Sequence, residues 1–210
     1  MADIISILKE QAILKNLPES LLIRLSKAAT EKTFLQEEIL MSEGDTSNEI
    51  FFIKKGVVFV YNLLENGAIV PVATLHEGQS VGEMGVITNK VRSATVEALS
   101  DLEIVAITSD EFRAIMKSNY TLAEDLLKDL SGRIKDENAL LRIQKEKHLP
   151  ERAWTLLQEL NRHFENNTIN LSHEKLSQLA GVTRPRFTEA LHTLVEEKKI
   201  KLSFNSVILL

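Results

Sequence analysis

Hydrophobic positions near the start of the chain follow a helical period. In residues 3–30 the apolar side chains recur three or four positions apart, as at Ile4 and Leu8 and again at Leu21 and Leu25. This spacing places them on one face of a helix. We therefore predict helical structure for this stretch.

From about residue 33 the pattern changes to short strands separated by turns. Apolar runs of strand length occupy residues 49–53, 57–61, 68–74 and 102–107. Asn66-Gly67 stands between two of these runs and predicts a β-hairpin, because both residues tolerate a positive φ. Six or more short strands at this spacing favour a compact β-barrel or jelly-roll.

Helical spacing returns over residues 109–147, with a break predicted at 118–120. The second part carries a narrow apolar seam flanked by charge, made of Leu127, Leu130, Ile134 and Leu141. A narrow seam is more typical of a helix that pairs with a second subunit than of one that packs only on its own domain. Asn138 lies near the seam, where one polar residue can fix the register of such a pair.

The last 60 residues predict three helices and two short strands. Pro150 suits the first turn of a helix at 150–164, and further helices are predicted at 173–179 and 184–197. Ser172 and Thr183 are predicted N-caps of the second and third helices. Strands follow around residues 204–206.

Residues 171–200 have the pattern of a helix-turn-helix. Gly181 permits the left-handed turn between two short helices, and small Ser177 lets them approach closely. The terminal strand pair would form a wing. Pro185 disfavours helical geometry at Arg184, which predicts that the last helix begins one residue late.

The helix-turn-helix pattern predicts contact with double-stranded DNA. An arginine at the start of the recognition helix can donate two hydrogen bonds to guanine, and residues at helix starts suit phosphates. The candidate DNA-binding residues are His173, Thr183, Arg184, Arg186 and Glu189.

Composition and charge place this acid-rich chain among soluble globular proteins. Of the 210 residues, 44% are hydrophobic and 26% charged, and the net charge is −5. Residues 1–150 hold 17 Lys+Arg against 23 Asp+Glu, whereas residues 151–210 hold 8 against 7. The acid therefore lies in the N-terminal part, and the C-terminal part can still bind a polyanion through clustered bases.

Several classes of function are disfavoured. No apolar run approaches the about 20 residues that cross a bilayer, and the N-terminus lacks a secretion signal, so we expect a cytoplasmic protein without a membrane partner. The chain has no cysteine, which excludes a cysteine-held iron–sulfur cluster. Asp45, His76 and Glu83 form no spacing-defined triad or metal site, so we expect neither a catalytic residue nor a metal.

The stretch "GQSVGEMGVITNKVRSATV", residues 78–96, places an acid and a base in an apolar context. Glycines at 78 and 82 allow close backbone approach to an anion. Glu83 could accept a hydrogen bond from a ribose hydroxyl, and Arg92 with Ser93 could hold a phosphate. The alternative is that Glu83 and Arg92 simply pair with each other.

This stretch, together with "GDTSNEIFFIKKGVVFVY" before it and the helix-turn-helix after it, resembles the cyclic AMP receptor protein/FNR family of bacterial transcription regulators. The resemblance covers essentially the whole chain. It implies an α+β fold with an N-terminal β-roll (jelly-roll) cyclic-nucleotide-binding-like sensor at 1–120, a dimerisation helix and hinge at 121–147, and a winged helix-turn-helix at 148–210.

The resemblance also implies the ligand and its contacts. Cyclic AMP is the first choice and cyclic GMP the second; the implied contacts are Gly82, Glu83, Met84, Arg92 and Ser93. The base-reading position of the family falls on Leu141-Arg142, which carries no hydroxyl, and Asn138 or Arg142 would substitute. Binding would reorient the DNA-binding domains about a hinge near 147–150.

The implied partners are a second copy of the chain, a palindromic DNA operator and, as a further candidate, RNA polymerase. Arg184 matches the recognition helix of well-known members, whereas Pro185, Arg186 and Glu189 stand where these carry Glu, Thr and Arg. We therefore expect a different operator sequence. An alternative function is a regulator whose small-molecule site is vestigial or different, with DNA binding constitutive or controlled by another signal.

Overall fold

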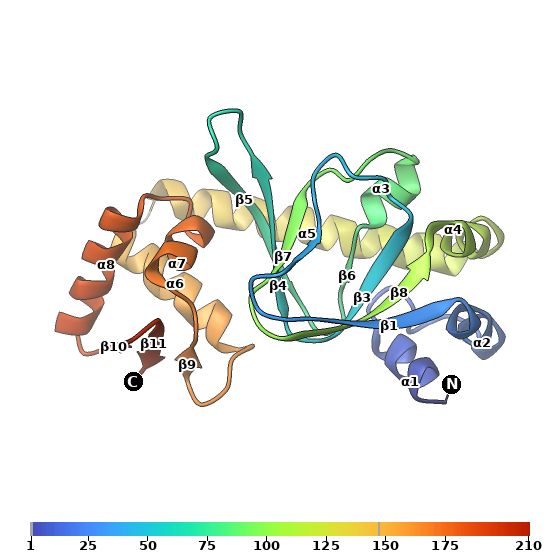
Figure 1. Ribbon diagram of the computed structural model, residues 1–210, viewed down its shortest axis with the longest axis horizontal. Coiled ribbons are helices and arrows are strands. Elements are labelled where there is room, and N and C mark those ends of the chain that lie inside the picture. The colour runs from blue at the N-terminus through green and yellow to red at the C-terminus, as the bar shows by residue number, and fades with distance from the viewer. Residues whose placement is uncertain (1, 147) are drawn as a thin grey trace. The chain divides into compact units, whose positions relative to one another are not determined.

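The computed structural model describes residues 2–146 and 148–210, and for residues 2–3 and 136–146 it describes the backbone path alone. The chain divides into two compact units (Figure 1): residues 1–62 with 73–136, and residues 63–72 with 137–210. None of the helices in the described part is long and apolar enough to cross a membrane.

Two four-stranded sheets form the predicted β-roll. One sheet has the order β1-β8-β3-β6, with β1 at Ala29–Phe34, β8 at Leu102–Thr108, β3 at Glu49–Lys55 and β6 at Ser80–Val81. The other has the order β2-β7-β4-β5, with β2 at Ile39–Met41, β7 at Thr95–Ala98, β4 at Val57–Leu63 and β5 at Ile69–His76. The α+β class and the strand-rich N-terminal region expected from the sequence are confirmed.

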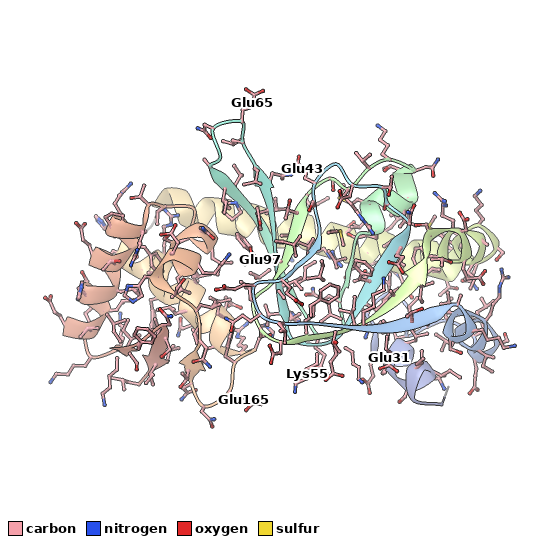
Figure 2. The ribbon with its side chains drawn as sticks, viewed as in Figure 1. Glu31, Glu43, Lys55, Glu65, Glu97 and Glu165 are labelled. Atoms are coloured by element: carbon pink, nitrogen blue, oxygen red, sulfur yellow. The ribbon has the colours of Figure 1, made fainter. Side chains whose placement is uncertain are left out.

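The predicted hairpin joins β4 to β5. Gly67 has a φ of +78°, and the turn is closed by a hydrogen bond from the Leu64 amide to the Ala68 carbonyl, 2.9 Å. Glu65 marks its tip in Figure 2. The predicted hairpin is confirmed, but of the Asn66-Gly67 pair Gly67 alone has a positive φ.

Helices cover one face of the first sheet and build its core. They are α1 at Ala2–Glu10, α2 at Glu19–Lys27, α4 at Ser109–Ser118 and the first half of α5 at Tyr120–Glu146, and the break predicted at 118–120 is confirmed. The buried cluster joins Leu8, Leu22, Phe52, Phe112 and Leu126. Burial of such side chains is the main stabilising contribution to this unit.

The predicted helical stretch 3–30 extends too far. Helix α2 ends at Lys27, and β1 begins at Ala29 with the sequence ATEKTF. This strand is mostly polar and partly exposed, and it pairs along its full length with β8. The backbone pairing with β8, which no local pattern shows, determines its conformation.

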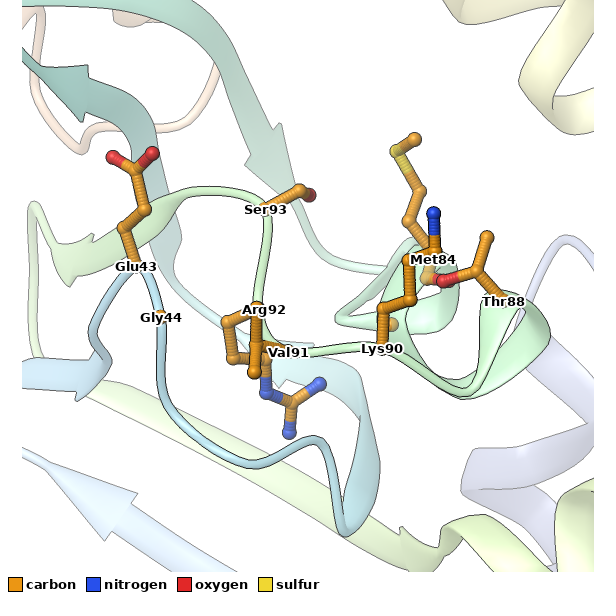
Figure 3. A pocket seen from close by; sticks show the side chains of 9 residues that line it. Glu43, Gly44, Met84, Thr88, Lys90, Val91, Arg92 and Ser93 are labelled. Atoms are coloured by element: carbon orange, nitrogen blue, oxygen red, sulfur yellow. The ribbon is translucent and has the colours of Figure 1, made fainter.

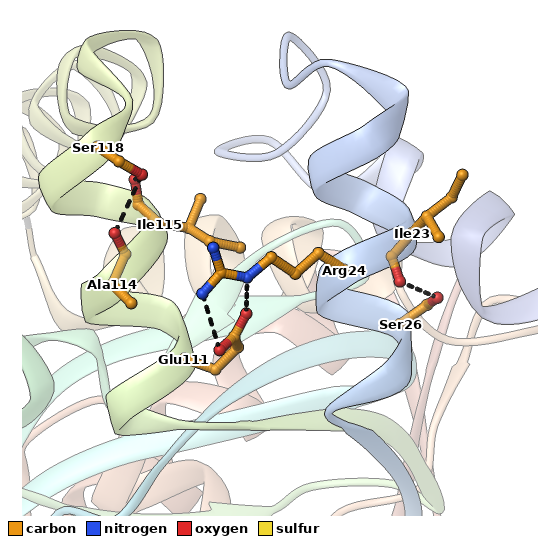
Figure 4. Close-up of polar contacts among 7 residues, drawn as sticks. All are labelled: Ile23, Arg24, Ser26, Glu111, Ala114, Ile115 and Ser118. Atoms are coloured by element: carbon orange, nitrogen blue, oxygen red, sulfur yellow. Dashed lines mark hydrogen bonds and ion pairs between the residues drawn. The ribbon is translucent and has the colours of Figure 1, made fainter.

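An ion pair joins α2 to α4 (Figure 4). The Arg24 Nε donates to Glu111 Oε1 at 2.5 Å, and Nη2 donates to Oε2 at 3.2 Å. These two hydrogen bonds connect the helices on one side of the core, and because the pair is partly exposed to solvent its contribution to stability is small.

The predicted seam on α5 differs in one position. Leu127 and Ile134 are exposed, by 65% and 59%, whereas Leu130 packs against the core of its own unit. The exposed stripe instead continues to Tyr120, which is 80% exposed and stands seven residues before Leu127. Leu141 lies outside the residues whose side chains are described.

The second unit contains the predicted winged helix-turn-helix. It has α6 at Leu149–Asn161, β9 at Thr168–Ile169, α7 at His173–Leu179, α8 at Arg184–Glu196, β10 at Ile200–Ser203 and β11 at Ser206–Leu209. The strands form one sheet in the order β10-β11-β9. Phe187, Leu191 and Leu194 of α8 are buried, as the sequence pattern indicates.

The turn between α7 and α8 has the expected geometry with one correction. Gly181 has a φ of +64°, and the Ser172 hydroxyl caps α7 by accepting from the Lys175 amide at 3.2 Å. The prediction that the recognition helix begins late is wrong, because α8 already begins at Arg184. Thr183 is the extended residue before it. Pro185 lies in the first turn, where backbone N–H groups make no hydrogen bond within the helix, so the N–H that proline lacks is not needed.

Candidate functional site

A short helix and a loop build the candidate ligand site. Helix α3, Glu83–Thr88, begins after Gly82, which has a φ of +87°, and is followed by its C-cap Asn89, which has a φ of +55°. Arg113 of α4 donates from Nη1 to the Val86 carbonyl at 3.4 Å and to Asn89 Oδ1 at 2.5 Å. Helix α4 therefore holds the C-terminal end of α3 in place.

The loop after β2 braces the second half of this segment. The Gly44 amide donates to the Arg92 carbonyl at 3.0 Å, and the Arg92 amide donates to the Asp45 carbonyl at 2.8 Å. Ser47 lies so close to Gly85 that a methyl group at residue 85 would overlap it, at 2.5 Å from the hydroxyl oxygen. Thus residues 42–47 and 82–93 pack as one structural element.

The Arg92 side chain is buried, with 4% of its surface exposed. Its Nη1 donates to the Gly82 carbonyl at 2.9 Å and its Nη2 to the Glu49 carbonyl at 2.7 Å, while the guanidinium carbon lies 5.5 Å from the centre of the Phe51 ring. Its Nε has no hydrogen-bond acceptor. Burial lowers the pKa of Arg92, and nearby carboxylates oppose this change.

The Glu83 side chain is also buried, with 5% exposed. Its Oε1 accepts from Nη1 of Arg133, on α5, at 3.2 Å, and its Oε2 has no donor. Burial raises the pKa of the Glu83 carboxyl, and the Arg133 charge opposes the increase. A buried carboxylate oxygen without a hydrogen-bond donor costs free energy. Glu83 Oε2 can therefore accept a hydrogen bond from a hydroxyl or N–H group with a gain in stability.

A cavity of about 460 Å³ opens beside these residues (Figure 3). The residues that line it are Glu43, Gly44, Met84, Gly85, Thr88, Lys90, Val91, Arg92 and Ser93. In Figure 3 the Arg92 guanidinium points to the opposite side of the loop from the Glu43, Met84 and Lys90 side chains. The volume falls in the range of small-molecule sites in proteins, about 300–1,000 Å³.

The structure brings together five of the six predicted ligand contacts. All five lie in the segment of α3 and the loop after it. Met84, Arg92 and Ser93 line the cavity, whereas Gly82 and Glu83 lie beside it without lining it. The alternative in which Glu83 and Arg92 pair with each other is wrong for this structure, because Glu83 pairs with Arg133 and Arg92 binds two backbone carbonyls.

The sixth predicted contact, Asn138, and the base-reading candidates Leu141 and Arg142 lie outside the residues whose side chains are described. Their roles stay predictions. Arg133 was missed by sequence reasoning, because it lies 50 residues from Glu83 and no local pattern connects the two.

The predicted DNA-binding residues lie on or beside two different faces of α8. On one face Thr188 lies against His173 of α7, with 3.5 Å between Thr188 Oγ1 and His173 Nδ1. Burial, and then the charges of Arg184 and His192, lower the pKa of His173. Thr183 and Arg184 are exposed at the start of the helix.

Arg186 and Glu189 lie on the other face of α8. Both line a hollow of about 310 Å³ beside the start of α6, together with His148 and Pro150. The predicted residues therefore form two separate groups, and sequence spacing alone did not distinguish them.

Arg152, a second residue that the sequence pattern did not identify, links α6 to the helix-turn-helix. The Arg152 Nη2 donates to the Ala180 carbonyl, at the end of α7, at 2.8 Å. Burial lowers the pKa of Arg152, and the nearby Arg186 charge contributes in the same direction. Arg152 thus helps to orient the turn before the recognition helix.

No group of three or more potential metal ligands is present among the described residues. The polar groups gathered in the first unit can accept and donate hydrogen bonds and carry charge.

Comparison with known proteins places this site in a family context. Residues 31–119 match the cyclic nucleotide-binding domain family. The chain is 24% identical over 176 residues to the cyclic AMP receptor protein of Thermus thermophilus, covering 84% of this chain and 82% of that protein. It is 27% identical over 180 residues to the global nitrogen regulator of Nostoc, covering 81% of each.

Solved structures show the same fold. The c-di-GMP-responsive global regulator CLP of Xanthomonas campestris superposes with a TM-score of 0.76 at 16% identity, covering 91% of this chain and 99% of the other. A CRP/FNR-family transcriptional regulator from Thermus thermophilus superposes with a TM-score of 0.73 at 18% identity, covering 86% and 93%.

Proposed function

Because this chain belongs to the cyclic AMP receptor protein/FNR family of transcription regulators, we propose that it binds DNA in response to a cyclic nucleotide, with cyclic AMP as the first candidate and cyclic GMP as the second. In this proposal the nucleotide enters the cavity beside α3 and shifts the balance between two orientations of the DNA-binding units. The protein would act in the cytoplasm, where its DNA is.

The observation that carries this proposal is the buried Glu83 carboxylate with one oxygen that lacks a donor. Within a cyclic nucleotide-binding domain, a ribose hydroxyl can supply that donor. The phosphate would lie near Arg92 and Ser93, where the unpaired Nε of Arg92 is an available donor. Gly82 and Met84 would offer backbone contacts to the same ligand.

Dimerisation through α5 is part of the proposal. The exposed positions Tyr120, Leu127 and Ile134 are seven residues apart, which is the spacing of a paired helix. Two copies would present two recognition helices to a palindromic operator. Arg184 is our candidate for direct base contact, while His173 and Thr183 would contact phosphates. RNA polymerase is a further candidate partner.

The proposal is tested by thermal unfolding and DNA binding with each candidate ligand. A ligand at about 100 times its Kd stabilises the folded state by about 2.7 kcal/mol, which is readily measured as an increase in Tm. We expect this increase with cyclic AMP, together with a change in affinity for operator DNA at a fixed salt concentration. The Arg92→Ala variant should lose the ligand-induced increase.

The exposed cation Lys117, on α4, gives the matched control, and Lys117→Ala should retain the increase. Because Arg92→Ala also removes two hydrogen bonds to carbonyls, the ligand-induced change is compared, and not Tm itself. An unchanged response in Arg92→Ala removes Arg92 from the site. No response of the unmodified protein to either cyclic AMP or cyclic GMP refutes the nucleotide proposal.

A second candidate function follows from the way Arg92 is held. Both of its terminal nitrogens already donate to backbone carbonyls without any ligand, as expected of a residue with a structural role. In that case DNA binding is constitutive or responds to a different small molecule. DNA affinity that is high without ligand and unaffected by either nucleotide would favour this alternative, and cyclic di-GMP belongs in the same assay because the CLP regulator responds to it.

A further inference from the structure

The Arg133 guanidinium lies between two carboxylates of the first unit. Its Nη1 is 3.2 Å from Glu83 Oε1, and its Nη2 is 2.8 Å from Asp129 Oδ2. The Nη2 also donates to the Ser80 carbonyl at 2.8 Å. Asp129 stands one helical turn before Arg133 on α5, so the helix itself supplies this second acid.

Each carboxylate is left with an unsatisfied oxygen. Glu83 Oε2 has no donor, and Asp129 Oδ2 approaches the guanidinium as an ion pair without forming a hydrogen bond. The Asp129 side chain is 13% exposed. An ionised carboxylate can only accept, so neither oxygen can be satisfied without a new donor or a movement of Arg133.

A movement of Arg133 would satisfy Glu83 completely. Arginine and a carboxylate often pair through two parallel hydrogen bonds, which is the stronger arrangement. Here Nη2 of Arg133 contacts the Ser80 carbonyl and Asp129, so Arg133 binds Glu83 through Nη1 alone. Glu83 Oε2 is thereby kept available.

We propose that Asp129 is a positioning residue for ligand specificity: it holds Arg133 away from Glu83 Oε2, so that this oxygen accepts a hydroxyl group of the ligand. The inference rests on the proposed function, in which that hydroxyl is the free ribose hydroxyl of a cyclic nucleotide. Asp129 acts through Arg133 and need not touch the ligand.

An Asp129 substitution is expected to change selectivity. Without the negative charge of Asp129, both terminal nitrogens of Arg133 can donate to Glu83. Arg133 then occupies Glu83 Oε2, the acceptor that the ligand hydroxyl needs. A ligand with the hydroxyl then loses its advantage over one without it. A residue that only stabilised α5 would change affinity for both ligands equally.

The test compares 3′,5′-cyclic AMP with its 2′-deoxy analogue by titration calorimetry on the full chain. We expect the unmodified protein to prefer the hydroxylated ligand by about tenfold or more, as for a hydrogen bond to a charged group. In Asp129→Asn the preference should fall to about threefold or less. Glu124→Gln is the matched control, because Glu124 lies on the same helix and pairs with exposed Lys128, and it should keep the full preference.

The outcomes separate this inference from the proposed function. If the unmodified protein binds neither ligand, the proposed function is refuted, and this inference with it. If the unmodified protein binds both equally, or if Asp129→Asn keeps the full preference, only the role of Asp129 is refuted. Loss of all binding by a folded Asp129→Asn would also overturn it, because a positioning residue leaves the remaining contacts in place.

Folding of each variant is checked by circular dichroism and thermal unfolding. If Asp129→Asn does not fold, Asp129→Ser serves as the second variant, with the same expected loss of preference. The conservative Asp129→Glu retains the charge and should restore most of the preference for the hydroxylated ligand. A preference in Asp129→Glu as low as in the neutral variant would contradict the electrostatic argument.

Discussion

Gly82 shows how one residue controls the candidate site. It adopts a φ of +87°, and a methyl group there would overlap the Nη1 of Arg92, whose hydrogen bond ends on the Gly82 carbonyl. The glycine is needed for its backbone conformation and for the space that it leaves. It thereby sets both the start of α3 and the position of the buried guanidinium.

We predict that Gly82→Ala destabilises the protein by more than the about 1–2 kcal/mol expected for an alanine at positive φ. The excess arises because Arg92 must move and lose its hydrogen bonds. Urea unfolding measures the free energy, with Gly67→Ala as the control, since Gly67 has a φ of +78° and nothing within 4 Å of the added methyl. Equal losses in the two variants would show that Arg92 adapts without cost.

The environment of His173 predicts that the stability of the second unit depends on pH. Its pKa lies below the ordinary value because of burial and of the Arg184 and His192 charges. As pH falls below about 6.5 the unfolded state takes up the proton first, so the free energy of unfolding should decrease towards acid. The stabilising contribution of neutral His173 should be fully present above that pH.

Unfolding of His173→Gln should therefore be less sensitive to pH between about 7.5 and 5.5 than unfolding of the unmodified protein. The effect should be small, because the side chain is partly exposed to solvent. Exposed His163, in the same unit, provides the control as His163→Gln. An identical pH dependence in His173→Gln and the unmodified protein would contradict the expectation.

At the scale of elements, α5 has two different faces. Leu122 and Leu126 are buried in the core of the first unit, whereas Leu127 and Ile134 are exposed. A helix with an apolar stripe exposed to water is typical of one that pairs with a second chain. The core-facing side anchors the helix independently of any partner.

The double substitution Leu127→Glu and Ile134→Glu should therefore produce a folded monomer. Removing apolar area from both sides of the contact, and adding like charges, should weaken dimerisation by about a hundredfold or more. Light scattering after size-exclusion chromatography measures the mass, and circular dichroism checks the fold. Lys135→Glu, an exposed neighbour, should remain dimeric; a dimeric double variant would place the interface elsewhere.

Helix α3 and the loop before β3 act as one element. Backbone hydrogen bonds join Gly44 and Asp45 to Arg92, and Arg113 holds the end of α3. The candidate ligand site is therefore held by helix α4 on one side and by the loop at residues 42–47 on the other. This arrangement limits the movement available to Arg92 and Glu83 and makes the side chain of Arg133 the adjustable part.

At the scale of the whole molecule, the proposed regulation is a coupling between two binding equilibria. If a cyclic nucleotide raises the affinity for operator DNA by some factor, the operator must raise the affinity for the nucleotide by the same factor. Coupling of this kind usually amounts to about 5–150-fold.

We predict that titration of the nucleotide in the presence of saturating operator DNA gives a Kd lower by the factor found in the DNA-binding assay. A scrambled duplex of equal length, at the same salt concentration, serves as the control, because its contacts are mainly to phosphates. Unequal factors in the two titrations would show that the two ligands do not act on one shared equilibrium.

The hydrophobic pattern by itself determined much of this protein. Alternating and helical spacing predicted the strand-rich first region, the break before α5 and the helices of the second unit, because those elements bury their own apolar faces. Gly67 and Gly181 marked their turns because few residues other than glycine adopt the required backbone angles. Strand β1 was missed, since its polar sequence is held by pairing with β8.

The candidate site needed the tertiary structure. The sequence identified Glu83 and Arg92 as a charged pair in an apolar segment, but not their partners. Arg133 comes to Glu83 from 50 residues away, and Arg92 binds carbonyls that only the folded β-roll brings within reach. Local patterns report which side chains face a core. Which buried charge meets which partner depends on contacts between distant segments, and those are set by packing.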